Sequence, residues 1–132
     1  MHVELAPLGV DVLASAPGPV KSGFAKLLHG MAAETREQHD RGCLLLSANL
    51  HRDTKDAVVT NLLRDNEARV EAIFESALRR AQKKGELSAK ENARALARFF
   101  VVTIQGMRAL ARLKSDRKAL AQVADVALSV FG

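Results

Sequence analysis

A proline-free stretch from Ser88 to Leu113 constrains the fold more than any other part of the chain. Ser88 and Glu91 have the spacing of a capping box, in which each side chain bonds to the other residue's backbone N–H. Apolar residues then recur at intervals of three and four, which predicts one long amphipathic helix. Its predicted core face consists of Leu96, Phe100, Thr103, Met107 and Leu110, and its predicted solvent face of Arg94, Arg98, Gln105, Arg108 and Arg112.

A third stripe lies beside the predicted core face and is made mostly of small residues. Small side chains in a heptad-like spacing allow a second helix to come close. A glycine inside a helix costs about 1 kcal/mol relative to alanine, so Gly106 favours such a close approach, although neutral tolerance of the glycine stays an alternative. We therefore expect this helix to pack inward on its own domain and sideways on a partner. The stripe comprises Ala95, Val102, Gly106, Ala109 and Leu113.

Composition favours an all-α fold and a single domain. The chain has 132 residues, of which 48% are hydrophobic, and it contains no Trp or Tyr. A chain of this length buries roughly two-thirds of its unfolded surface, and few β-branched residues accompany the helix-forming Ala, Leu, Arg, Lys and Glu. The net charge of +5 is compatible with a solvated basic surface or with nonspecific nucleic-acid binding.

Cysteine usage and hydropathy favour a cytoplasmic protein. Cys43 is the single cysteine, so no intramolecular disulfide is possible. The N-terminal apolar stretch lacks a basic region and carries Glu4 and Asp11, which argues against a signal peptide. No apolar run approaches the ~18 residues of a membrane span, and we expect no membrane association.

The first half of the chain predicts two short helices and one longer helix between them. Residues 3–16 form a weakly amphipathic helix interrupted by Pro7 and Gly9. From Val20 to Met31 the apolar spacing predicts a helix with one buried face. Residues 42–50 are apolar and could form a strand, but the chain offers no second strand to pair with, which favours a buried short helix.

The second half of the chain predicts three long helices, giving about five to six in total. Asp53 or Thr54 is expected to cap a helix that ends near Lys84, with Gly85 in the C′ position. The helix described first follows. Ser115 is then expected to cap a last helix that reaches Phe131, and its apolar arc is wide enough to be covered on two sides.

The sequence shows no catalytic or metal-binding motif. The four histidines lack the spacing of paired zinc ligands. His39, Cys43 and His51 could meet only if they shared a helix turn, which Gly42 and the charged residues around it disfavour. We therefore expect no enzyme activity, no metal and no cofactor.

Polar residues within apolar faces indicate a ligand cavity. An unpaired buried polar group costs on the order of 1–3 kcal/mol, so such residues either bond to one another and to backbone or anchor a small molecule. Apolar walls with a few polar anchors are typical of small-molecule sites. The same apolar residues are equally natural as plain core. The candidate pocket residues are Phe24, Leu28, Met31, Asn49, Asn66, Val70, Phe74, Phe100, Thr103 and Met107.

Three segments, taken in order, resemble the C-terminal domain of tetracycline-repressor (TetR) family transcriptional regulators. They are Arg41-Gly42-Cys43-Leu44-Leu45, the Gly85-Glu86-Leu87 linker that follows a basic helix end, and Gln105-Gly106-Met107-Arg108. The resemblance covers roughly residues 20–131. It implies an all-α regulatory domain that binds a small-molecule inducer between its helices, and that pairs its last two helices with those of a second copy in a four-helix dimer bundle.

The resemblance sets the expected organisation and partners of the chain. Residues 1–132 are expected to form one regulatory domain, without the helix-turn-helix head that precedes it in the family, so that DNA is bound only through such a head. The alternative is a helical adaptor that binds a protein partner and has no cavity. The expected homodimer interface consists of Ala95, Val102, Gly106, Ala109, Leu113, Val123, Val126, Ala127 and Val130.

Overall fold

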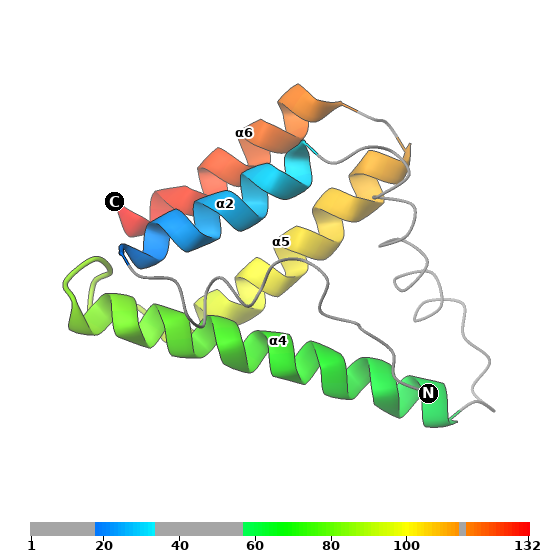
Figure 1. Cartoon of the computed structure of the whole chain (residues 1–132), viewed down its shortest axis with the longest axis horizontal. Coiled ribbons are helices and arrows are strands. Elements are labelled where there is room, and N and C mark those ends of the chain that lie inside the picture. Colours follow the sequence, from blue (N-terminus) through cyan, green and yellow to red (C-terminus); the bar gives the residue numbers. More distant parts are fainter. Residues whose placement is uncertain (1–17, 34–56, 114–115) are drawn as a thin grey trace.

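The computed structural model describes residues 18–33, 57–113 and 116–132, and this part of the chain is all-helical (Figure 1). The described elements are α2 (Val20–Ala32), α4 (Ala57–Lys83), α5 (Ala93–Leu113), α6 (Arg117–Leu128) and the 3₁₀ turn η1 (Ser129–Phe131). The all-α prediction is confirmed for these residues. The short helices expected at 3–16 and 42–50 lie outside them, as does the expected cap at Asp53 or Thr54.

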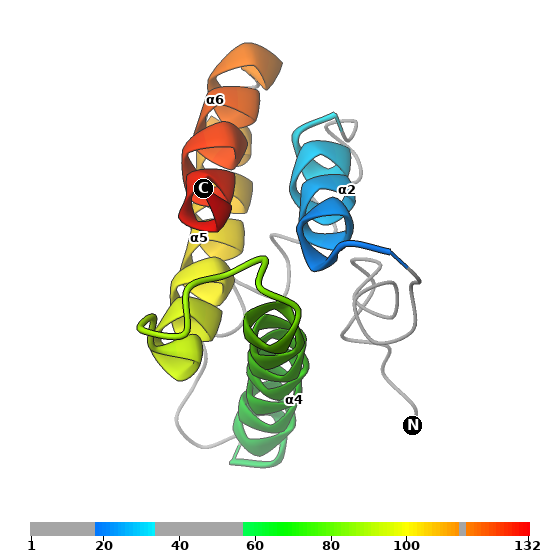
Figure 2. The same ribbon diagram turned by 90° about the vertical axis from the view of Figure 1, so that its left-hand side faces the viewer.

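Each of the four α-helices lies most closely along two of the others, and the ring of Phe24 adds a contact between α2 and α5. Helix α4 runs along α5, α6 runs along α2, and the contacts of α5 with α6 and of α2 with α4 complete the arrangement. In Figure 1, α2 and α6 lie side by side above α4, and α5 crosses between these two layers. Figure 2 shows α5 and α6 together on one side of the bundle.

The buried faces of α2 and α4 follow the apolar periodicity. Helix α2 buries residues at spacings of four, three, one and three, which were predicted from the sequence and are confirmed: Val20, Phe24, Leu27, Leu28 and Met31. Helix α4 buries Val70, Phe74, Ala77, Leu78 and Ala81. These spacings place the side chains on one stripe of each helix, and burial of that stripe stabilises the bundle.

The end of α4 is a Schellman motif, as the glycine at position 85 predicted. Gly85 has a φ of +80°, a conformation that glycine adopts without a steric penalty. The N–H of Glu86 donates to the carbonyl of Ala81 at 2.9 Å, and the N–H of Gly85 donates to that of Gln82 at 3.2 Å. These bonds satisfy carbonyls that the helix end leaves unpaired.

The start of α5 differs from the prediction. The helix begins at Ala93, and Asn92 Oδ1 accepts a hydrogen bond from the N–H of Ala95 at 3.0 Å. The capping box predicted from Ser88 and Glu91 is wrong, because Ser88 Oγ accepts instead from the N–H of Lys90 at 3.2 Å and closes a local turn. Asparagine caps a helix as well as serine does, and Asn92 lies directly before the first residue of α5.

The start of α6 also differs by one residue from the prediction. Asp116 Oδ1 accepts from the N–H of Ala119 at 3.0 Å, which makes Asp116 the N-cap in place of the predicted Ser115. The carboxylate also lies at the positive end of the helix dipole. Helix α6 passes into η1 before Phe131, so the last turn is 3₁₀ and not α-helical.

The N-terminus of α2 is stabilised from another part of the chain. Its N-cap residue is Pro19, which provides no side-chain hydrogen bond. The backbone N–H of Lys21 donates to Glu86 Oε1 at 3.3 Å, so a carboxylate from the α4–α5 loop lies at this helix start. Helix N-termini favour such negative charge. The α4–α5 loop is therefore bonded to the start of α2.

Candidate functional site

Seven of the ten candidate pocket residues meet in the interior of the bundle. They are the apolar members of the set, and each is almost fully buried: Phe24, Leu28 and Met31 on α2, Val70 and Phe74 on α4, and Phe100 and Met107 on α5. The structure thus brings residues from three helices to one place. Their arrangement is an apolar interior of the kind that lines small-molecule sites or fills a core.

Aromatic rings form the centre of this interior. The ring of Phe24 stacks on that of Phe100 with a centroid distance of 4.5 Å, and it meets the edge of Phe74 at 5.4 Å. The ring centroid of Phe131 in η1 lies 5.7 Å from that of Phe24. Such offset and edge-to-face pairs each contribute about 0.5–1.5 kcal/mol beyond their buried area. We call Phe24, Phe74, Phe100 and Phe131 the aromatic cluster.

The three polar candidates are Asn49, Asn66 and Thr103. Asn49 falls outside the described residues, and Asn66 and Thr103 are both half-buried. Thr103 Oγ1 donates to the carbonyl of Phe99 at 2.7 Å, a bond within its own helix that serines and threonines often form. The hydroxyl proton of Thr103 is therefore already used by backbone.

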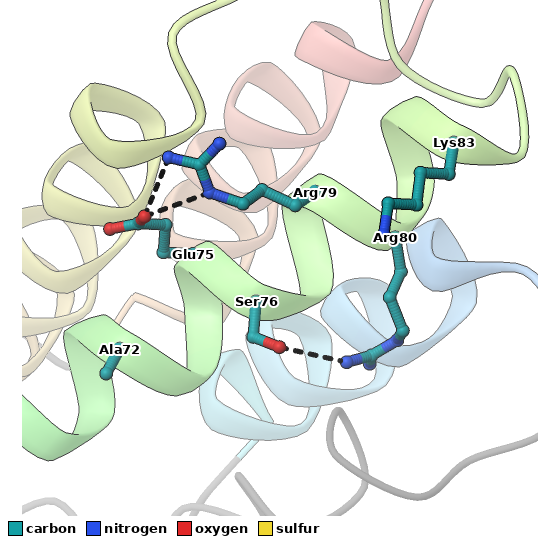
Figure 3. A pocket seen from close by; sticks show the side chains of 6 residues that line it. All are labelled: Ala72, Glu75, Ser76, Arg79, Arg80 and Lys83. Carbon is teal, nitrogen blue, oxygen red and sulfur yellow. Dashed lines mark hydrogen bonds and ion pairs between the residues drawn. The ribbon is translucent and has the colours of Figure 1, made fainter.

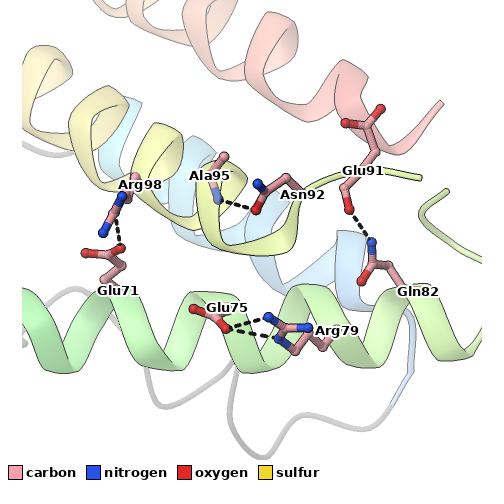
Figure 4. Close-up of polar contacts among 8 residues, drawn as sticks. All are labelled: Glu71, Glu75, Arg79, Gln82, Glu91, Asn92, Ala95 and Arg98. Carbon is pink, nitrogen blue, oxygen red and sulfur yellow. Dashed lines mark hydrogen bonds and ion pairs between the residues drawn. The ribbon is translucent and has the colours of Figure 1, made fainter. Parts of the chain in front are cut away.

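Polar contacts join helices α4 and α5. Arg98 Nε donates to Glu71 Oε1 at 2.7 Å (Figure 4), and Gln105 Nε2 donates to Glu67 Oε1 at 3.0 Å. The α4–α5 loop is held in a similar way, since Gln82 Nε2 donates to the backbone carbonyl of Glu91 at 2.8 Å (Figure 4). Arg98 and Gln105 are thus directed toward α4.

The buried side of α5 is rotated from the one predicted. Its buried residues are Ala93, Ala97, Phe100, Val101, Ile104, Met107, Arg108 and Ala111. At 100° per residue this stripe lies roughly 70° from the predicted core face. The placement of Arg108 on the solvent face is therefore wrong, because its side chain is only 7% exposed. Leu110, predicted in the core, is exposed.

The rotation of α5 leaves an apolar surface on the outside of the bundle. Phe99 is 42% exposed, Val102 65% and Leu113 86%, and on α6 Val126 is 70% exposed. Contiguous exposed apolar residues of this size mark interaction sites. We define the α5–α6 face as Phe99, Val102, Leu110 and Leu113 of α5 with Val123 and Val126 of α6, which are all the exposed large hydrophobic residues among those the structure describes.

Most of the predicted dimer residues lie on or beside the α5–α6 face. Ala95, Val102, Gly106, Leu113, Val123 and Val126 are exposed, and Ala109 and Val130 are half-buried. Ala127 is 1% exposed and belongs to the core of its own chain, so it offers almost no surface to a second copy.

Phe99 is the main residue of this face that the sequence reasoning missed. It lies four residues after Ala95 and three before Val102, so it completes the heptad-like spacing of the small-residue stripe. That spacing was a usable signal. It was overlooked because Phe99 adjoins Phe100, which the spacing placed on the predicted core face.

A surface hollow of about 360 Å³ lies elsewhere, along the outer side of α4 (Figure 3). Ala72, Glu75, Ser76, Arg79, Arg80 and Lys83 line it. Two of its cations have partners, because Arg79 is paired with Glu75 at 2.9 Å and Arg80 Nη1 donates to Ser76 Oγ at 3.5 Å. All the described lining residues belong to one helix. The hollow therefore lacks side chains that converge from several elements, as they do in an anion-binding pocket.

A histidine joins α2 to α6 at the surface, where His29 Nε2 lies 2.9 Å from Asp125 Oδ1. His39, Cys43 and His51 lie outside the described residues. Among the helices that the structure describes, none combines the length and the apolar character needed to cross a bilayer.

The architecture defines an all-helical domain with an apolar interior and one uncovered apolar face. Its sequence matches the family described as the tetracyclin repressor-like, C-terminal domain, over residues 23–127. Because the match covers most of the chain, the protein belongs to this family. Domains of the family are regulatory and not enzymatic, and they typically dimerise and bind ligands. No curated protein and no solved structure gives a match.

Proposed function

We propose that this chain is the inducer-binding and dimerisation domain of a TetR-type transcriptional repressor that acts in the cytoplasm. The observation that carries the proposal is the α5–α6 face, where the exposed large hydrophobic residues of the described chain are gathered on its last two helices. A symmetric dimer uses the same patch on both copies. In this proposal a second copy covers the face, and the four helices of the two copies form a bundle.

The ligand part of the proposal uses the interior between α2, α4 and α5. An apolar small molecule would enter beside Phe24, Phe74 and Phe100, with Asn66 and Thr103 at the edge as polar partners. A ligand changes a conformational equilibrium only when it binds one state better than the other. Spreading α2 from α4 and α5 is the change that insertion there requires. In the intact repressor, that shift would alter a DNA-binding head and release the operator.

Sedimentation tests the dimer. We expect the chain to sediment as a dimer at micromolar concentration, and Val102→Lys to raise the dimer dissociation constant by about tenfold or more, because it places a charge in an apolar contact. Ser22→Lys adds the same charge at an exposed position of α2 and should leave the dimer unchanged. A monomeric wild-type chain would refute the dimerisation part of the proposal.

The close packing of the aromatic cluster favours a second candidate, the helical adaptor without a cavity. Its rings contact one another directly, with 4.5 Å between the centroids of Phe24 and Phe100, so the described residues already fill this part of the interior. An adaptor would keep that packing and bind a protein partner through the α5–α6 face.

A thermal-shift screen with apolar small molecules separates the two candidates. A ligand of the native state at a hundred times its dissociation constant stabilises it by about 2.7 kcal/mol, which is a clear rise in melting temperature. The inducer-binding domain predicts such hits, and Thr103→Val or Phe74→Leu should weaken them selectively. A diverse library of apolar compounds that gives no hit would favour the adaptor.

A further inference from the structure

The exposed edge of α5 alternates small and large side chains around Val102. In order, the edge carries Ala95, Phe99, Val102, Gly106 and Ala109, at spacings of four, three, four and three. Phe99 and Val102 are exposed. A Cβ placed on Gly106 would meet, beyond the backbone of its own helix, no atom of the described residues within 4 Å. Nothing in the described chain therefore requires a glycine in the middle of this helix.

The flanking polar residues leave the edge itself apolar. Arg98 and Gln105 are turned toward α4, where Glu71 and Glu67 accept their hydrogen bonds at 2.7 and 3.0 Å. Held in this way, both side chains stand beside the edge and do not cover it. A second helix can approach Val102 and Gly106 without first displacing a charge.

Symmetry restricts how a second copy can use this edge. In a two-fold dimer with antiparallel α5 helices and the axis beside Val102, a residue before Val102 faces the residue at the same distance after it. Ala95 then faces Ala109 of the other copy, since each lies seven residues from Val102. Phe99, three residues before the axis, lies opposite Gly106, four residues after it, with an offset of one residue. A parallel pairing would set Phe99 against itself and Gly106 against itself, leaving one crowded contact and one gap.

We propose that the two copies of α5 cross in an antiparallel arrangement with the two-fold axis beside Val102, and that Phe99 of each copy fills the space over Gly106 of the other. The inference rests on the dimer of the proposed function and adds its register and its central contact. A large aromatic residue seated in a matching gap at the centre of an interface is the usual form of a binding hot spot.

Cysteine crosslinking tests the register in the full chain with Cys43→Ser as the background. Val102→Cys should crosslink to its own copy with mild oxidant or a short bis-maleimide. Leu113→Cys should not, because eleven residues from the axis at 1.5 Å per residue place the two copies roughly 30 Å apart. Both positions are exposed on the same helix, so reagent access is matched.

The outcomes separate this inference from the proposed function. Crosslinking at both Val102→Cys and Leu113→Cys would indicate parallel helices, because every position of the edge would then face its own copy. A dimer in which neither crosslinks would place the axis elsewhere, for example between α5 and the other copy's α6. Either result overturns the register and leaves the dimer standing. A monomer in sedimentation overturns both.

A size exchange tests the contact between positions 99 and 106. Phe99→Ala and Gly106→Phe should each weaken the dimer by about tenfold or more, through a gap and a clash respectively. The double variant places a large residue opposite a small one again and should recover most of the lost affinity. Gly30→Phe makes the same change at an open position of α2 and should not affect dimerisation. Additive losses in the double variant would contradict the contact.

Discussion

At the scale of single residues, Phe24 connects α2 to three other elements of the bundle. Its ring contacts Phe74 of α4, Phe100 of α5 and Phe131 of η1, at centroid distances of 5.4, 4.5 and 5.7 Å. The side chain is fully buried. One residue of α2 therefore joins elements from the whole length of the described chain, and its loss affects three of them.

Replacing Phe24 with alanine should destabilise the fold strongly. Phe→Ala in a core typically costs about 3–5 kcal/mol, because apolar area is lost and a cavity remains. Urea unfolding at a fixed protein concentration would measure the loss. Lys26→Ala, an exposed change on the same helix, should shift the free energy of unfolding by no more than about 0.5 kcal/mol. A loss below about 1 kcal/mol for Phe24→Ala would show that the cluster does not hold the bundle together.

The burial of individual residues could be predicted well for α2 and less well for α5. Helix α2 has one apolar stripe, so periodicity identified Phe24, Leu28 and Met31 without ambiguity. Helix α5 is apolar on more than one side, and periodicity alone does not say which side turns inward. The side that turns inward packs against α4 and α6, and Arg98 and Gln105 bond to α4 beside it. Both kinds of contact depend on neighbouring helices that the α5 sequence does not contain. Arg108 was misplaced for that reason.

At the scale of elements, the helix ends depend on competition between nearby capping residues. Ser88 and Asn92 both precede α5, and Asn92 forms the cap while Ser88 closes the turn before it. Gln82 holds this loop by donating to the carbonyls of Ser88 and Glu91 at 3.0 and 2.8 Å. Gly85, in contrast, had no competitor, and its role at the end of α4 could be predicted.

Alanine substitution should distinguish the two candidate caps of α5. Asn92→Ala should lower the free energy of unfolding by about 1 kcal/mol, because the N–H of Ala95 loses its acceptor. Ser88→Ala removes only a solvent-exposed turn contact and should cost less than about 0.5 kcal/mol. Thermal or urea unfolding of the two variants side by side gives the comparison. A larger loss of stability for Ser88→Ala than for Asn92→Ala would indicate that Ser88 is the N-cap of α5.

At the scale of the whole molecule, two apolar regions of different character coexist. The interior is closed by the four packed helices, whereas the α5–α6 face is left open on the described chain. The family and the existence of the small-residue stripe could be predicted from sequence, since both are carried by local spacing. The breadth of the face could not, because Phe99 and Leu110 became exposed only through the rotation of α5.

The open face should make stability depend on concentration. If dimerisation covers it, the thermal midpoint of unfolding rises with protein concentration by mass action. We expect this rise for the wild-type chain over a hundredfold range, and its loss in Val126→Lys, which alters α6 without touching the core. Lys118→Ala, also exposed on α6, is the matched control. A wild-type midpoint that is independent of concentration would contradict a dimer coupled to folding.

The aromatic cluster also has a consequence for how the chain is made. Phe24 lies near one end of the described sequence and Phe131 near the other, yet their rings are neighbours. During synthesis the ribosome releases Phe24 long before Phe131 has been added. The apolar stripes of α2 and α4 therefore stay uncovered until α5 and η1 have been synthesised. Exposed stripes of this kind bind chaperones and other nascent chains. The interior of this domain is therefore completed only after the residues of η1 have been added.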